Sequence, residues 1–179
     1  MTEISERYRR LSTNFARVLQ EVPAERWTAQ SPCDEWDGLG VARHIVEVHG
    51  MFEKLAGRPI EVPNVDGGPT EAFDEVRSLM QADLDDPVRA GAEWDGFFGR
   101  TSFEDAVDRF VAFDLIVHAW DLATAAGLNE QIPDAELDRL EDDIAYFGEN
   151  LAGVVGPPVE VGAEADRQTR ILAKLGRNA

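Results

Sequence analysis

The chain has 179 residues, of which 44% are apolar, a composition typical of a globular protein with one buried core. Acidic residues outnumber basic residues 35 to 17, and the formal net charge of −18 disfavours binding to nucleic acid or to an anionic membrane. Cys33 is the single cysteine, so an intramolecular disulfide is excluded. No apolar run is long enough to span a bilayer and no basic leader begins the chain, which favours a cytoplasmic location.

Every long segment carries apolar residues at helical spacing, and sustained strand-like alternation is lacking. Ser102 is a suitable N-cap with Asp105 at the capping-box position, and Gly127 is suitable just beyond the end of the same helix. The predicted fold is all-α: one domain over residues 1–179, a bundle of four principal helices and an additional C-terminal helical or extended segment. The predicted helices cover residues 6–21, 37–56, 70–82, 102–126, 134–151 and 166–175.

Residues 87–100 form a long connection with unusual aromatic content, including Trp94, Phe97 and Phe98. An irregular loop of this kind is often functional. The simpler interpretation, which we favour, is a segment that covers the end of the helical bundle.

The most informative motif is Asp114-Leu-Ile-Val-His118-Ala-Trp-Asp121, within the predicted helix over residues 102–126. At about 100° per residue, Asp114, His118 and Asp121 share one face of that helix. Two carboxylates and an imidazole in an apolar run are costly to bury unless they are paired or bind a metal. His44 lies on a separate apolar helix, so one divalent metal between the helices would satisfy His44, Asp114 and His118 together.

Imidazole and carboxylate ligands suit zinc, nickel, iron or manganese, and three protein ligands leave positions for water or substrate. Asp121 is either a fourth ligand or, as we prefer, a residue that orients a ligand histidine or pairs with an arginine such as Arg43. His49 lies about 140° around the helix from His44 and is expected to be exposed or at a helix edge. Glu47 is interpreted as a solvated helix charge.

Cys33 follows Pro32 ahead of the His44 helix, where a helix N-terminus can lower the pKa of a thiol. A nucleophilic Cys33 is an alternative that we do not favour, because no basic partner lies nearby in the sequence. The sequence contains no glycine-rich phosphate loop, nucleophile-elbow serine or dinucleotide fingerprint.

These residues resemble a known family. Ser-Pro-Cys-Asp-Glu-Trp at residues 31–36 ahead of the His44 helix, followed by Asp114-x-x-x-His118-x-x-Asp121-Leu, is similar to the mycothiol-dependent maleylpyruvate isomerases, which belong to the DinB-like metal-binding four-helix bundles. The closing residues 157–161 and 170–177 resemble an actinobacterial subfamily of uncharacterised proteins. In the isomerase, a histidine of the second helix and a Glu-x-x-x-His pair hold the metal. The resemblance places His44 and His118 at the two histidines, and Asp114 where the family has glutamate.

The resemblance implies a metal-dependent S-transferase or isomerase that uses a low-molecular-weight thiol such as mycothiol as cosubstrate and acts on a small electrophilic organic molecule. Zinc is favoured over nickel, iron or manganese. The aromatic residues 94–98 would then shape the substrate pocket. The maleylpyruvate reaction itself is not expected, because the isomerase has a C-terminal domain that this chain is too short to contain. The alternative is a non-catalytic bundle that binds a metal or small ligand in a stress response, and a homodimer is the oligomer considered.

Overall fold

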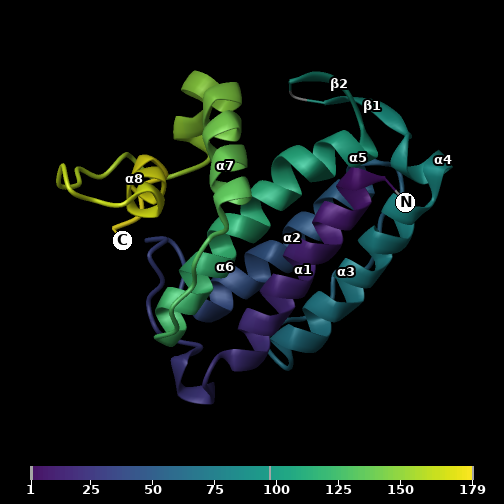
Figure 1. The fold of residues 1–179 in the computed structure, drawn as a ribbon. Coiled ribbons are helices and arrows are strands. Elements are labelled where there is room, and N and C mark those ends of the chain that lie inside the picture. The colour runs from purple at the N-terminus through teal and green to yellow at the C-terminus, as the bar shows by residue number, and fades with distance from the viewer. Residues whose placement is uncertain (1, 97, 179) are drawn as a thin grey trace.

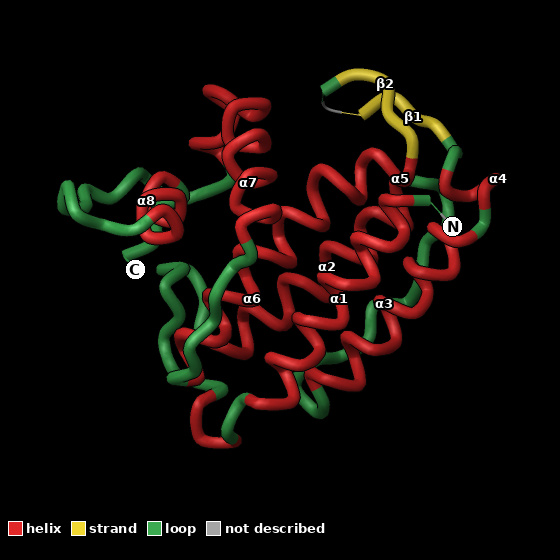
Figure 2. Tube along the Cα trace, in the orientation of Figure 1, coloured by secondary structure: helices red, strands yellow, loops and turns green. Residues whose placement is uncertain are grey.

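The computed structural model describes residues 2–96 and 98–178. Helices dominate this part of the chain, and its sheet consists of two short strands, so the all-α prediction is confirmed (Figures 1 and 2). Among the same residues, no helix combines the length and apolarity needed to cross a membrane. The elements are α1 (Glu3–Glu21), a 3-10 turn η1 (Ala24–Arg26), α2 (Gly38–Leu55), α3 (Pro69–Asp85), α4 (Pro87–Ala90), β1 (Glu93–Gly96), β2 (Gly99–Ser102), α5 (Phe103–Ala106), η2 (Val107–Val111), α6 (Ala112–Ala126), α7 (Asp134–Phe147), a 3-10 segment η3 (Gly148–Gly153) and α8 (Arg167–Lys174).

The helices α1, α2, α3 and α6 pack along one another as a bundle (Figure 1). Both α1 and α2 contact α3 on one side and α6 on the other, which encloses an apolar core. Phe15 of α1 and Phe73 of α3 meet edge to face in that core, with ring centroids 4.9 Å apart. Full burial of such side chains contributes roughly 1.5–3 kcal/mol each, which makes the core the main source of stability.

The helix α6 is buried on two sides, which explains its nearly continuous apolar sequence. Leu115 and Leu122 face the core of the bundle. Ile116 and Trp120 face a second apolar cluster, which also contains Leu140 of α7, Ile171 and Leu172 of α8, and Leu175 directly after α8. The polar side chains of His118 and Asp121 are also buried in this helix.

The predicted helix over residues 102–126 contains a feature that periodicity did not indicate. Ser102 caps it as predicted, accepting a hydrogen bond from the Asp105 amide at 3.1 Å, and Gly127 ends it with a left-handed φ of 77°. Between α5 and α6, however, Val107–Val111 is a π-helical segment. Such segments rotate the following residues relative to a regular helix and often occur near functional sites. Asp114 lies three residues beyond this one.

The connection over residues 87–100 is more regular than we expected. Residues 87–102 contain α4 and the antiparallel hairpin β1–β2, in which Trp94 lies opposite Thr101. Each strand has only four residues, too few to give a recognisable alternating pattern. Trp94 packs against the bundle core, and Phe98 packs against Phe110 with ring centroids 5.8 Å apart, so the hairpin covers one end of the bundle as predicted. Phe97 lies outside the described residues.

Candidate metal centre

The loop before α2 is held by a dense set of local hydrogen bonds. The hydroxyl of Ser31 donates to the Trp36 carbonyl at 2.7 Å, and the Gln30 side-chain amide donates to the same oxygen at 3.0 Å. Asp37 then caps α2, accepting from the Gly40 amide at 2.8 Å. A side chain at residue 40 would meet the Trp36 Cβ at 2.9 Å, so glycine allows the loop to lie directly on the helix. These contacts fix Trp36 beside the first turns of α2.

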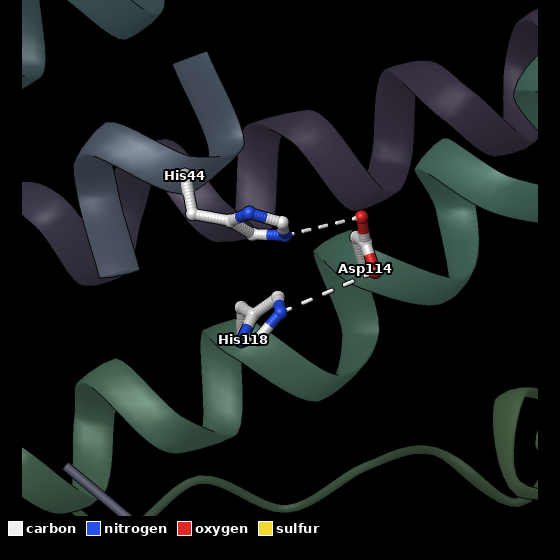
Figure 3. Close-up of side chains that lie close together, drawn as sticks. All are labelled: His44, Asp114 and His118. Carbon is white, nitrogen blue, oxygen red and sulfur yellow. Dashed lines mark ion pairs between the residues drawn. The ribbon is translucent and has the colours of Figure 1, made fainter. Parts of the chain in front are cut away.

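His44, Asp114 and His118 converge, although they come from two helices (Figure 3). One ligand atom from each residue can be chosen so that all three lie within 4.8 Å of one another. His44 Nε2 is 3.4 Å from one Asp114 oxygen, and His118 Nε2 is 4.0 Å from the other. We expected separations of roughly 3–4 Å, which follow from metal–ligand bonds of about 2.0–2.2 Å. The 4.8 Å span of the three ligand atoms is thus slightly wider than we expected.

Trp36 packs on both histidines of the cluster. Its ring stacks on His44, with centroids 4.3 Å apart and an interplanar angle of 22°. It meets His118 edge to face at 5.4 Å, and the two imidazoles lie 4.8 Å apart. These ring contacts restrict the orientations of both imidazoles.

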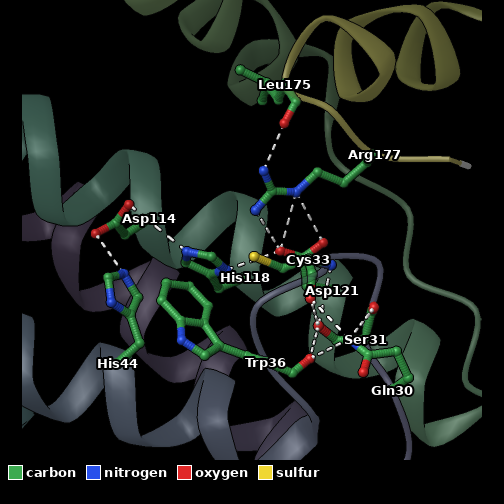
Figure 4. A network of polar contacts seen from close by, with 10 residues as sticks. All are labelled: Gln30, Ser31, Cys33, Trp36, His44, Asp114, His118, Asp121, Leu175 and Arg177. Carbon is green, nitrogen blue, oxygen red and sulfur yellow. Dashed lines mark hydrogen bonds and ion pairs between the residues drawn. The ribbon is translucent and has the colours of Figure 1, made fainter. Parts of the chain in front are cut away.

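Asp121 lies behind the cluster and holds the far side of the His118 ring (Figure 4). Its Oδ2 is 2.9 Å from His118 Nδ1, and it accepts a hydrogen bond when Nδ1 carries the hydrogen. The other ring nitrogen, Nε2, then has a free lone pair and lies 4.0 Å from the nearer Asp114 oxygen. Burial alone would raise the pKa of Asp121, but the contacts with His118 and Arg177 lower it below its ordinary value. Asp121 is outside the three-residue cluster, which agrees with the orienting role that we preferred.

The arginine that pairs with Asp121 is not the one named from the sequence. Arg177 Nη2 donates to Asp121 Oδ2 at 2.9 Å, whereas Arg43 pairs with Asp66 at 2.6 Å. Arg177 is separated from Asp121 by 56 residues, and nothing in its local sequence links it to the cluster. Only the packing of α8 onto α6 brings the two side chains together.

The remaining sequence candidates have structural roles. His49 is fully buried, contrary to our expectation, because Tyr8 of α1 supplies a partner for its ring. Glu47 is exposed, as predicted. Burial raises the pKa of the half-buried Cys33 thiol, although the charge of Arg177 partly opposes this, and a raised pKa disfavours a Cys33 thiolate.

A cavity of about 530 Å³ opens beside the cluster. Its walls come from the loop before α2, from two C-terminal stretches and from the cluster itself, since His44, Asp114 and His118 all line it. Among the described residues, none from the β1–β2 hairpin lines this cavity, so the prediction that residues 94–98 shape it is wrong. The hairpin covers the opposite end of the bundle from α8 (Figure 1). The C-terminal walls contain Ala152–Pro157, Val159, Gly176 and Arg177.

The fold and the site define a helical protein with a His/Asp/His cluster at a cavity. Residues 8–123 match the mycothiol maleylpyruvate isomerase N-terminal domain, and the chain belongs to this family, as predicted. Two similar proteins, named Uncharacterized protein Rv0738 and Uncharacterized protein MT0763, come from Mycobacterium tuberculosis strains H37Rv and CDC 1551. Each is 25% identical over 147 residues, which is 82% of this chain and 80% of the relative. No solved structure matches the chain significantly.

Proposed function

We propose that this protein is a metal-dependent enzyme that activates a low-molecular-weight thiol of the mycothiol type and transfers it to, or uses it to isomerise, a small electrophilic organic substrate. The observation that carries the proposal is the position of His44, Asp114 and His118 at a cavity large enough for small molecules. Membership of the mycothiol maleylpyruvate isomerase N-terminal domain family supports the choice of thiol.

The donor set fits a divalent metal. Two imidazole nitrogens and one carboxylate are ligands that zinc, nickel, iron and manganese accept, and zinc is our first choice. Asp121 fixes the ring of His118, and Trp36 restricts that of His44. Three protein ligands on one side leave the cavity side open to a thiol or a substrate. When bound, a divalent metal lowers the pKa of a coordinated thiol and so supplies a nucleophile near neutral pH.

The cavity is lined by both apolar and acidic side chains, which would contact the substrate and the thiol differently. Phe113, Val154 and Val155 provide apolar surface for the body of an organic molecule. Asp34 and Glu35 add negative charge to the lining, in a chain of net charge −18. This field does not attract an anionic thiolate, so the thiol is expected to enter as the neutral form and to lose its proton inside the site.

The alternative, a non-catalytic binding protein, is less well supported. A binding site that served only to hold a metal would be closed by its protein ligands. Here the cluster faces a cavity, and one of its residues, His44, retains 25% of its side-chain exposure.

Calorimetry of the zinc-loaded protein with mycothiol tests the proposal. The titration is run in two buffers of different ionisation enthalpy, because a thiol that loses its proton on binding gives a heat that depends on the buffer. We expect buffer-dependent heat for the wild type and for E47A, an exposed position on α2, and no binding heat for H118A. The same heat in both buffers, or no binding of mycothiol, bacillithiol or glutathione, would contradict the thiol reaction.

A further inference from the structure

The C-terminal end of α8 directs Arg177 toward the bundle. The Gly176 amide donates to the Ala173 carbonyl at 3.1 Å, and the Arg177 amide donates to the Leu172 carbonyl at 3.0 Å. This pair of hydrogen bonds is a Schellman motif, with Gly176 in the left-handed region at φ 83°. The motif reverses the chain direction directly after the helix, while Leu172 and Leu175 anchor α8 in the second apolar cluster.

Gly176 also permits close contact between the two C-terminal walls of the cavity. A Cβ at this position would lie 2.8 Å from both Cα and the carbonyl carbon of Gly156. Val159, just beyond, donates its amide to the Ala173 carbonyl at 2.9 Å. The end of α8 and the segment around Gly156 are therefore held together as one wall.

The side chain of Arg177 extends from this wall toward Asp121 and His118 (Figure 4). It is 4% exposed, and Asp121 is fully buried. Both Nε and Nη2 of Arg177 contact the Asp121 carboxylate, at 3.3 and 2.9 Å, while Nη1 donates to the Leu175 carbonyl at 2.7 Å. The guanidinium is thus fixed at both ends, one on its own helix terminus and one on the carboxylate that holds His118.

We propose that Arg177 is a positioning residue of the metal centre, which fixes the Asp121 carboxylate and through it the ring of His118. Arg177 compensates the buried charge of Asp121. A buried carboxylate without a partner raises the free energy of the folded state, so Asp121 would have to move or find another donor if Arg177 were lost. Either change would release His118 Nδ1 and let the imidazole turn away from Asp114. The family match ends at residue 123, so this contribution comes from a segment outside the matched domain. The proposal rests on the metal-binding part of the proposed function but not on the thiol reaction.

The test compares R177M and R177K with R170M in the full-length protein. Arg170 lies on the exposed side of the same helix and donates to the Ala165 carbonyl, so R170M removes an arginine without touching the metal centre. Zinc affinity is measured by chelator competition. Loss of the direct partner of a ligand histidine typically weakens metal binding 10–100-fold. Arg177 acts on His118 only through Asp121, so we expect up to about tenfold weaker binding for R177M, less for R177K, and no change for R170M.

A second measurement uses the metal-free protein, so that it does not depend on zinc binding. Nitrogen-15 NMR of the histidine rings reports which nitrogen of His118 carries the hydrogen. We expect the Nδ1–H form in the wild type and in R170M, and a mixture with the Nε2–H form in R177M and, to a smaller degree, in R177K. If R177M does not fold, R177K supplies the comparison.

The proposal is overturned if the Arg177 variants keep the wild-type His118 ring spectrum. If the wild type binds no divalent metal but the ring spectrum changes in R177M, the proposed function fails while the positioning role of Arg177 stands. If metal binds and mycothiol does not, the thiol reaction alone is wrong.

Discussion

His49 and Glu53 lie one turn apart on α2, and both are buried outside the His44–Asp114–His118 cluster. His49 Nδ1 is 2.7 Å from the Ile45 carbonyl, and Nε2 is 3.0 Å from the Tyr8 hydroxyl. A neutral ring that donates from Nδ1 and accepts at Nε2 satisfies both contacts. Burial lowers the pKa of His49 to about 4, despite the opposing contribution of the Ile45 carbonyl.

Glu53 has the opposite shift. Burial, followed by the neighbouring Asp83 carboxylate, raises the pKa of Glu53 to about 7, although Arg58 opposes the change. Arg58 Nε contacts both carboxylates, and Glu53 Oε1 is buried without a hydrogen-bond partner among the described residues. The folded protein therefore favours neutral His49 and protonated Glu53.

These two residues predict opposing effects of pH on stability. Neutral His49 contributes fully to the free energy of unfolding above about pH 6.5, and this contribution is lost as the pH falls toward 4. Protonated Glu53 contributes fully below about pH 4.5, and its contribution is lost as the pH rises toward 7. Relative to the wild type, the free energy of unfolding of H49Q should rise between pH 6.5 and 4.5, and that of E53Q should fall, each by up to about 3 kcal/mol.

Urea unfolding at several values between pH 4.5 and 6.5 measures both slopes. The two variants serve as each other's control, because they remove contributions of opposite sign from the same helix. Parallel pH curves for H49Q, E53Q and the wild type would show that neither shift is present.

Single residues were predictable where their spacing carried the information. Asp114 and His118 lie four residues apart on a helix, so their adjacency followed from helical geometry alone. The pairing of Arg177 with Asp121, and of His49 with Tyr8, depends on contacts between helices that are far apart in the sequence. No periodicity argument indicates which of the 17 basic residues would reach Asp121.

At the level of elements, two helix ends offer a matched comparison. Both α2 and α8 end in a Schellman motif, with Gly57 at φ 77° and Gly176 at φ 83° in the left-handed position. A Cβ at Gly57 would meet nothing within 4 Å, whereas a Cβ at Gly176 would meet the Gly156 backbone at 2.8 Å. The two positions differ in their surroundings but hardly in backbone conformation.

G57A should therefore cost only the left-handed strain, about 1–2 kcal/mol of the free energy of unfolding. G176A should cost the same strain and a further ~1–3 kcal/mol, because the added methyl group overlaps backbone that must shift. Chemical unfolding of the two variants measures the difference. Equal losses in G57A and G176A would mean that the segment around Gly156 is not held against the end of α8.

Element boundaries were predictable where capping residues marked them, as at Ser102 and Gly127. The hairpin β1–β2 was not, because four-residue strands give no usable period. The π-helical segment Val107–Val111 was not predictable either, because the spacing of its apolar residues is compatible with a regular α-helix. The C-terminal wall of the cavity is mostly irregular backbone, whose position is set by glycine contacts that spacing does not reveal.

Across the whole molecule, α6 joins two apolar layers and carries Asp114 and His118 of the candidate metal centre. The bundle formed with α1, α2 and α3 supplies His44 and the core, while the segments that follow α7 and α8 supply the C-terminal wall of the cavity, including Arg177. The apolar core is extensive without any contribution from the cluster, so removal of the metal is expected to leave the fold intact.

Zinc titration of the metal-free protein, without an affinity tag, tests whether His44, Asp114 and His118 hold one divalent metal. We predict one zinc ion per chain for the wild type and for E47A, and loss of that site in H118A. Circular dichroism should show the same helix content in all three proteins. Zinc binding by H118A with the affinity of the wild type, or no zinc binding by the wild type, would show that these three residues do not form a metal site.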